Sequence, residues 1–380
     1  MQSVRNIQTI YISPRDNYIE GALIKTWLYE SKNPFPSKIK AIDASSIINL
    51  IIHHNEEAII REANTNKLLM VVLRNQIGED VLEYLNTTIT KMFDFRHPVA
   101  RQEDESLNQG HLAAAGYLAT RQCGIFTHVL NLKKQYHGSD LQYRHETKVV
   151  AVNALLFNYA MGLFPAEFTN NIKKALEEYN LPRLDGYNYG ATNKDFTISY
   201  MDKKIQLPFP LGLCQAYAAI NYAKYNHVDY NILDFAFACC SNRGIYDNQR
   251  TIQKGNFEGG NFFLTKWGIK IEMAANTLWC WPEKDEHGTT AIPSHGYQAA
   301  WSQNLAKRTV TAIEKWRKGT ENPDHVKYRQ NQIANDSYAA AALLTSLKKD
   351  DGSENESEEE LEKEELGEFM QLRFNNRKWC

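Results

Sequence analysis

The chain has 380 residues, of which 43% are hydrophobic and 11% aromatic, enough apolar material for a sizeable folded core. Its net charge of −2 conceals an uneven distribution, because residues 350–380 hold 11 Asp and Glu against 4 Lys and Arg, which leaves residues 1–349 mildly basic. The six cysteines show no paired spacing and no apolar run is long enough to span a membrane, which excludes a secreted disulfide framework and a membrane protein.

The first hundred residues predict strands and one helix. IQTIYIS (7–13) and KLLMVVLRN (67–75) are short β-branched or apolar runs, as strands require. Between them, residues 43–63 place apolar side chains at helical spacing after an Asp/Ser cap, which predicts a helix. The polar stretch 93–110, with Pro98 and Gly110, predicts a loop.

Beyond residue 110 the pattern predicts helices almost throughout. The predicted helices are 110–135, 145–164, 165–180, 211–226, 230–240, 295–319 and 324–349. A stretch rich in Gly, Tyr and Pro at 181–209 is the best candidate for a hinge between two lobes. We therefore expect a mainly α fold with two helical lobes and little β structure. The predicted parts are an N-terminal arm (1–20), an N-terminal lobe (21–185), a C-terminal lobe (186–349) and a disordered acidic tail (350–380).

Motifs of common enzyme classes are missing from the sequence. There is no GxxxxGK[ST], GxGxxG, HExxH or GxSxG pattern. His53 and Glu57 have the i, i+4 spacing of a helical metal pair, and residues 96–105 gather His, Asp and Glu, so a metal-dependent nuclease is an open alternative. The preferred interpretation is a protein that is not an enzyme and that holds no metal or other cofactor.

Basic residues interleaved with aromatic ones favour a different function, the binding of single-stranded RNA. Such clusters occur at 120–148, 239–270 and 307–332, on both sides of the predicted hinge. Cations that neutralise phosphates beside rings that stack on bases are typical of binding without sequence preference. Each cluster taken singly also fits a solvated helix face. The predicted RNA contacts are Lys133, Lys134, Arg144, Lys148, Arg243, Arg250, Lys254 and Lys266.

A short motif adds a family resemblance. FNYAMG (157–162) resembles the aromatic-Ser-aromatic-Ala-Met-Gly signature of nucleoproteins from non-segmented negative-sense RNA viruses, with Asn158 in the Ser position and Asn153-Ala154 in place of an upstream Tyr-Pro. Size and general character suggest the fungal mymonaviruses within that group. The resemblance implies two helical lobes that clamp genomic RNA and an acidic tail that recruits the viral phosphoprotein and polymerase.

We therefore predict a viral nucleoprotein that encapsidates single-stranded genomic RNA and polymerises with itself into a helical nucleocapsid. It would lie in the virion nucleocapsid and the host cytoplasm, with no membrane partner. The coat protein of a flexuous positive-strand RNA virus is a second interpretation, although an acidic C-terminus is not expected there. Within the tail, LEKEELGEFMQLRF (361–374) could form an amphipathic element that docks on the partner.

Overall fold

The computed structural model describes most of the chain between residues 7 and 320. The described residues are 7–30, 40–98, 110–116, 118–119, 126–127, 133–136, 139–179, 197–200, 203–207, 212–247, 249, 251–253, 255–318 and 320. The acidic tail (350–380), the helix predicted at 324–349 and most of the predicted hinge lie outside them. None of the described helices is long and apolar enough to cross a membrane.

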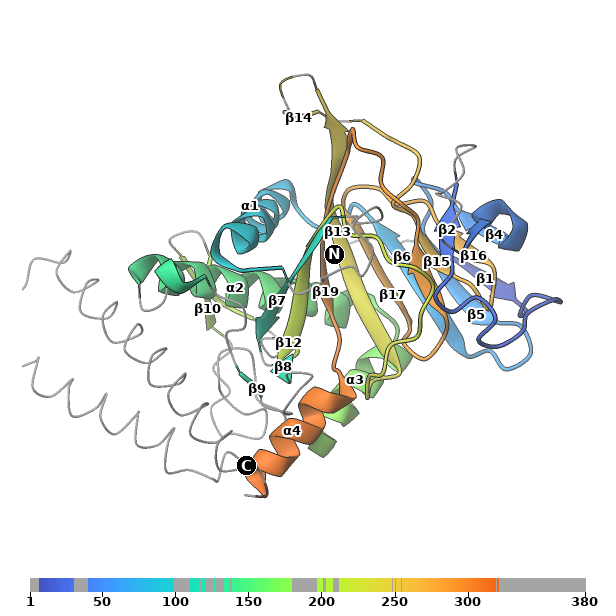
Figure 1. The fold of residues 1–380 in the computed structure, drawn as a ribbon. Coiled ribbons are helices and arrows are strands. Elements are labelled where there is room, and N and C mark those ends of the chain that lie inside the picture. Colours follow the sequence, from blue (N-terminus) through green and yellow to red (C-terminus); the bar gives the residue numbers. More distant parts are fainter. Residues whose placement is uncertain are drawn as a thin grey trace, which may run out of the picture.

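A large mixed sheet forms the centre of the molecule (Figure 1). Its strands, in spatial order, are β1 (Gln8–Ile12), β5 (Ala58–Glu62), β6 (Leu68–Arg74), β17 (Thr277–Pro282), β13 (Phe235–Tyr246), β19 (Gly296–Gln303), β12 (Gln215–Ile220) and β7 (His111–Gly116), and β14 (Ile252–Gln253) pairs with β13. Apart from the parallel pair β1–β5, neighbouring strands run antiparallel.

A second, smaller sheet packs against one face of the large one, on the right in Figure 1. Its strands, in spatial order, are β18 (His287–Thr289), β15 (Phe262–Leu264), β16 (Ile269–Ile271) and β4 (Leu50–Ile52). Phe262, Trp279 and Trp281 belong to the buried cluster that fills the space between the sheets. The two sheets therefore form a β-sandwich with an aromatic interior.

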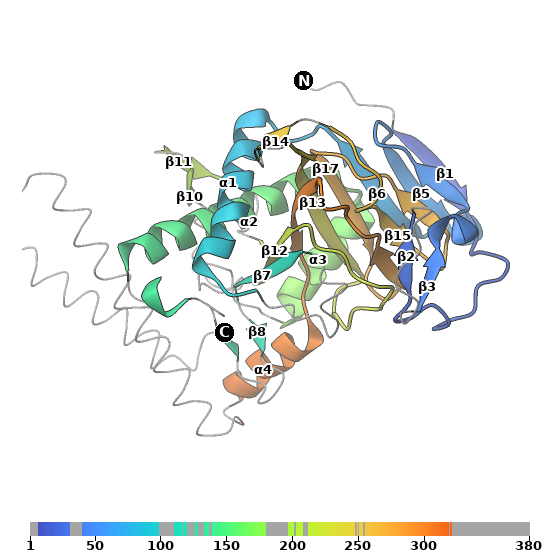
Figure 2. The same ribbon diagram turned by 45° about the horizontal axis from the view of Figure 1, so that its top comes forward.

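Helices cover the other face of the large sheet (Figures 1 and 2). They are α1 (Glu79–Phe95), α2 (Asp140–Leu163), α3 (Ala166–Tyr179) and α4 (Lys307–Arg317). The remaining described elements are the strand pairs β2 (Trp27–Tyr29) with β3 (Ala41–Asp43), β8 (Leu118–Ala119) with β9 (Phe126–Thr127) and β10 (Thr197–Tyr200) with β11 (Lys203–Gln206), and the 3-10 turns η1 (Ala44–Ile47) and η3 (Lys134–Tyr136).

The prediction of a mainly α fold is wrong, because several segments predicted as helices form the middle of the large sheet. The strands β7, β12 and β19 fall inside predicted helices, and so do β4, β5 and residues 235–240 of β13. The central strands are rich in alanine, which favours helices in isolation. Here Ala113, Ala216, Ala218 and Ala299 pack under the helices, where small side chains let the two layers approach closely. Tertiary packing thus overrides local preference.

The division into two lobes is not visible in the sheet order. Strands from both sides of the boundary at 185–186 join in the one large sheet, since β6 pairs with β17 and β7 pairs with β12. The N-terminal strand β1 pairs within its own chain, in register with β5. The domain boundaries proposed from the sequence stay a prediction.

Candidate metal centre

Three side chains that can ligate a metal meet between the two sheets. His227, Asp229 and His287 place one ligand atom each within 4.8 Å of the other two. The Nε2 atoms of both histidines lie 3.5 Å from the Asp229 carboxylate, one beside each oxygen. In the part of the chain that the structure describes, no other group of three such residues is found.

Backbone pairing sets this geometry. The His227 N–H donates to the His287 carbonyl at 2.8 Å, and the His287 N–H donates back to the His227 carbonyl at 2.9 Å. The two histidines are therefore direct partners across an antiparallel bridge. Because alternate residues of an extended chain point to the same side, Asp229 joins His227 on that side.

The tautomer of each histidine is also fixed. Nδ1 of His227 lies 2.9 Å from the carbonyl oxygen of Tyr225, and Nδ1 of His287 lies 2.9 Å from that of Asp285. A carbonyl oxygen can only accept, so both Nδ1 atoms carry the proton. The lone pair of each neutral ring is then on Nε2, the atom that faces Asp229. Histidine ligands in metalloproteins are oriented by the same kind of outer hydrogen bond.

The charges of the cluster suit a cation. Burial, and then the nearby His287 ring, lower the pKa of His227 to about 3, which keeps its ring neutral and able to ligate. Burial acts to raise the pKa of Asp229, but its interactions with His287, His227 and Lys224 outweigh burial and hold the pKa below its ordinary value. Burial, and then the charge of Asp229, raise the pKa of Glu283 well above its ordinary value. The site thus offers one carboxylate, from Asp229, and one imidazole that burial keeps neutral, from His227.

Aromatic side chains enclose one side of the cluster. The Phe262 ring stacks on the His287 ring with centroids 5.7 Å apart, and Trp281 lies at the same centroid distance. His287 is buried, with 5% of its side chain exposed, whereas 30% of the Asp229 side chain is exposed. Aromatic rings therefore shield the cluster from solvent on the side of His287, whereas solvent reaches it on the side of Asp229.

This donor set fits a mononuclear divalent metal with open coordination positions. Two histidines and one carboxylate are the ligands of the facial triad that holds non-haem Fe(II), and related sets bind Zn²⁺. His227, Asp229 and His287 are the residues that would hold the ion. The three side chains leave positions free for a substrate or a second small ligand on the exposed side of Asp229.

The residues predicted to contact RNA lie in different places. On the first stretch, Lys133 donates to the Phe93 carbonyl at 3.0 Å near the end of α1, whereas Arg144 and Lys148 are exposed on α2. The side chain of Lys134 lies outside the described residues. These four residues are thus not brought to the metal cluster, and RNA contact by them stays a prediction.

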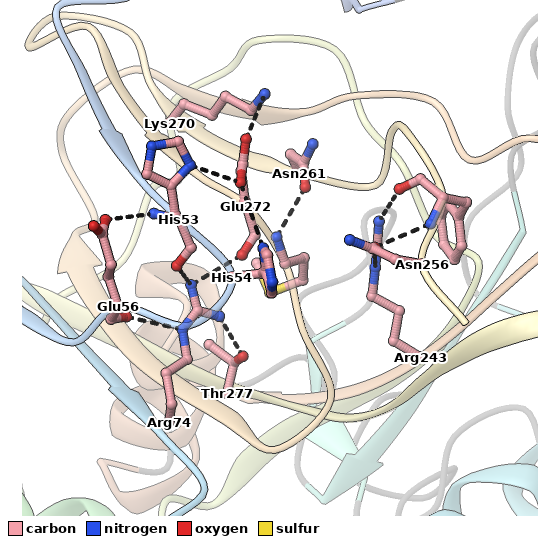
Figure 3. A network of polar contacts seen from close by, with 12 residues as sticks. His53, His54, Glu56, Arg74, Arg243, Asn256, Asn261, Lys270, Glu272 and Thr277 are labelled. Carbon is pink, nitrogen blue, oxygen red and sulfur yellow. Dashed lines mark hydrogen bonds and ion pairs between the residues drawn. The ribbon is translucent and has the colours of Figure 1, made fainter. Parts of the chain in front are cut away.

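On the second stretch, Arg243 is buried in a polar network (Figure 3). Its guanidinium donates to the carbonyls of Phe257 and Gly259 at 2.7 and 2.8 Å and also to Gln298. The Lys266 ammonium lies 5.0 Å from the centre of the Trp267 ring. Arg250 and Lys254 lie outside the described residues, and RNA contact on this stretch also stays a prediction.

The histidine and glutamate of the nuclease alternative are not joined. His53 Nδ1 lies 3.0 Å from Glu272, which Figure 3 shows beside Lys270, whereas the Glu57 carboxylate accepts the backbone N–H of Arg74 at 2.7 Å. A hollow of about 300 Å³ lies nearby, lined by Arg243, Asn256, Phe257, Glu258, Asn261, Lys270, Glu272 and Met273. Its main charges are paired, since Lys270 contacts Glu30 at 2.6 Å and Glu272 at 3.5 Å.

The metal cluster was missed in the sequence, although a weak signal was present. HVD (227–229) has the spacing that puts a His and an Asp on one side of an extended chain. Two such residues are common by chance. The third ligand comes from 58 positions further along, and only the bridge between His227 and His287 joins them.

Comparisons with known proteins were made for the sequence and for the fold. No protein-family model and no curated protein matches the sequence. Among solved structures, NgTET1 in complex with 5mC DNA matches with a TM-score of 0.35 and 11% identity, over 76% of this chain and 85% of that one. A 2OG-Fe(II) oxygenase family protein from Burkholderia pseudomallei matches with a TM-score of 0.30 and 12% identity, over 63% and 87%. The dioxygenase for auxin oxidation 1 from Arabidopsis thaliana, as a 2-oxoglutarate complex, has a TM-score of 0.27 and 11% identity, over 62% and 83%.

These findings correct the function predicted from the sequence. The solved structures named above include two oxygenases and no nucleoprotein, and the described residues form two packed sheets with helices on one face rather than a mainly α fold. The interpretation as a viral nucleoprotein is therefore wrong, as are the coat-protein alternative, the non-enzyme assignment and the RNA, nucleocapsid and phosphoprotein partners. FNYAMG is part of α2, where Phe157, Ala160 and Met161 pack in the core.

Proposed function

We propose that the protein is a non-haem Fe(II) oxygenase whose metal is held by His227, Asp229 and His287. The observation that carries this proposal is the cluster itself, with two Nε2 atoms and one carboxylate facing one another inside a β-sandwich. The chemistry that Fe(II) supplies at such a triad is O₂-dependent oxidation.

The protein's own groups would perform three tasks. Both imidazoles are fixed by hydrogen bonds to backbone carbonyls, so they present Nε2 without reorganisation. Asp229 supplies the negative charge that favours a divalent ion over a neutral ligand. Phe262 and Trp281 exclude water on the side of His287, whereas the exposed side of Asp229 leaves room for the substrate.

Metal binding by purified protein tests the proposal directly. After chelation and anaerobic addition of Fe(II), we expect tight uptake of one ion per chain, measured by atomic emission. His227→Ala, Asp229→Ala and His287→Ala should each abolish this uptake, because a three-ligand site loses a third of its donors. His54→Ala, at an exposed histidine outside the cluster, is the matched control and should bind iron normally.

Oxidation is tested with the loaded protein. Because the dioxygenase for auxin oxidation 1 was solved as a 2-oxoglutarate complex, 2-oxoglutarate is the first co-substrate to add. We expect a charge-transfer absorption band on anaerobic addition and slow O₂ consumption in air, both lost in Asp229→Ala. Uptake of iron that is unaffected by all three substitutions would contradict the proposal.

A further inference from the structure

A buried glutamate links the two halves of the metal centre. Glu286 directly precedes His287 and is 2% exposed. One carboxylate oxygen accepts from the Tyr18 hydroxyl at 3.0 Å and from the backbone N–H of Gly21. The other oxygen accepts from the Asn226 side-chain amide at 2.9 Å, and Asn226 directly precedes His227. One carboxylate thus connects the residues before both histidine ligands.

Backbone hydrogen bonds of the N-terminal segment 15–30 reach both the small sheet and the loop that carries His227. The Arg15 N–H donates to the Lys266 carbonyl at 3.0 Å. Lys25 and Thr26 form a reciprocal pair of backbone hydrogen bonds with Asn226, at 2.8 and 2.9 Å. Asn226 in turn accepts from the Thr265 hydroxyl through its side-chain oxygen. The loop that carries His227 is therefore held between this segment and the small sheet.

We infer that Glu286 is a positioning residue, which holds His227 opposite His287 by joining Asn226 to the N-terminal segment. The inference rests on the proposed metal site. The separation of the two rings depends on the isolated bridge between residues 227 and 287, beside which the Thr289 N–H also donates to the Lys224 carbonyl at 3.0 Å. Asn226 and Glu286 lie diagonally across this antiparallel bridge, and the hydrogen bond between their side chains ties the two segments together.

The link through Glu286 needs a carboxylate, with two oxygens that only accept hydrogen bonds. All three groups around it are donors, namely the Tyr18 hydroxyl, the Gly21 N–H and the Asn226 amide. In Glu286→Gln, the new NH₂ group must face at least one of these donors, which leaves a buried donor without an acceptor. The side-chain volume is almost unchanged, so the variant changes the link and not the packing.

Glu30 provides a matched control. Like Glu286 it is a buried glutamate, with 7% of its side chain exposed, and it lies in the N-terminal segment. Its carboxylate accepts from the side chains of Asn261, Thr290 and Lys270. None of these partners adjoins a metal ligand in the chain. Glu30→Gln therefore removes a comparable buried link between the same segment and the small sheet, away from the two histidines.

The first measurement is a titration of metal-free protein with Co(II), followed by its visible absorption. Outer-shell partners of ligating histidines are worth about 10- to 100-fold in metal affinity, and we expect a loss of that size in Glu286→Gln. Glu30→Gln should bind Co(II) close to wild type. Tyr18→Phe removes one of three donors and should show a smaller loss in the same direction, which keeps the inference testable if Glu286→Gln does not fold.

The second measurement needs no metal. The centroids of the His227 and His287 rings lie 4.4 Å apart, so histidine-labelled wild-type protein should show a nuclear Overhauser contact between their ring protons. This contact should disappear in Glu286→Gln and persist in Glu30→Gln. If wild-type protein binds no Co(II), the proposed function is wrong, and the ring contact alone decides the role of Glu286. Equal behaviour of the two glutamine variants in the ring contact would overturn the inference.

Discussion

Arg243 is a cationic side chain whose role is to hold a loop in place. It was predicted to contact RNA, yet its guanidinium donates to two carbonyls of the loop after β14 and to Gln298 on β19. It also lies over the Phe257 ring, 3.7 Å from its centre, and burial lowers its pKa. We expect Arg243→Met to lower the free energy of unfolding by at least about 2 kcal/mol, because each buried acceptor left unpaired costs about 1–3 kcal/mol. Urea unfolding followed by fluorescence measures this.

Arg144 on α2 is the control for that substitution. It is exposed, so Arg144→Met should change the free energy of unfolding by no more than about 0.5 kcal/mol. Equal destabilisation by the two substitutions would show that the loop does not depend on Arg243.

The metal ligands show what a local pattern can and cannot predict. The spacing of His227 and Asp229 is visible in the sequence, and an extended chain puts both on one side. Nothing in the sequence around His287 marks it as their partner. That relation follows from strand register, which is decided by the packing of the whole sandwich. Single residues could therefore be named as candidate ligands from the sequence, but their meeting in one site could not be predicted from it.

Some single elements were predictable from the local pattern, whether or not both of their faces are buried. The helices α2 and α3 and the strands β1 and β6 lie where the sequence predicts them. Besides β4, β5 and β7, the errors fall on β12, β13 and β19, which are largely buried. A strand of that kind has a continuous apolar run, and periodicity cannot distinguish it from a buried helix. The alanines beneath α1 and α2 then shift the prediction toward helix.

The helix α2 carries a buried histidine that makes its stability depend on pH. His145 stacks on Phe95, with ring centroids 4.5 Å apart, and burial lowers its pKa to about 4. In the unfolded chain its pKa is about 6.5, so between these values the unfolded state binds more protons. The free energy of unfolding should fall as pH drops from about 6.5 to 4, by about 3 kcal/mol for this residue. Below the folded pKa no further loss occurs.

His145→Phe tests this contribution, because phenylalanine can stack on Phe95 but does not titrate. We expect a flatter dependence of the urea midpoint on pH between about 4 and 6.5. His54→Gln, at an exposed histidine, should leave the wild-type slope in place. A slope that is the same in wild type and His145→Phe would refute the assignment to His145.

At the scale of the whole molecule, the proposed metal joins the two sheets. His227 and Asp229 follow β12 of the large sheet, whereas His287 begins β18 of the small one. An ion that binds only when these strands are packed must stabilise the folded state. At a free concentration of 100 times its dissociation constant, the gain is about 2.7 kcal/mol. We therefore expect thermal unfolding to move to higher temperature on addition of Co(II) and to return when EDTA removes the ion.

Two variants separate this linkage from metal effects elsewhere on the chain. Asp229→Asn removes the only charged ligand and His287→Gln removes the ligand of the small sheet, so each should abolish the Co(II)-dependent increase. Glu30→Gln weakens a buried link between the N-terminal segment and the small sheet without touching a ligand, so this variant should unfold at a lower temperature but keep the increase. A stabilisation by Co(II) that survives in both ligand variants would place the ion outside the sandwich. If only the ligand variants lose the Co(II)-dependent increase in unfolding temperature, the packing of the two sheets and the binding of the metal are thermodynamically linked.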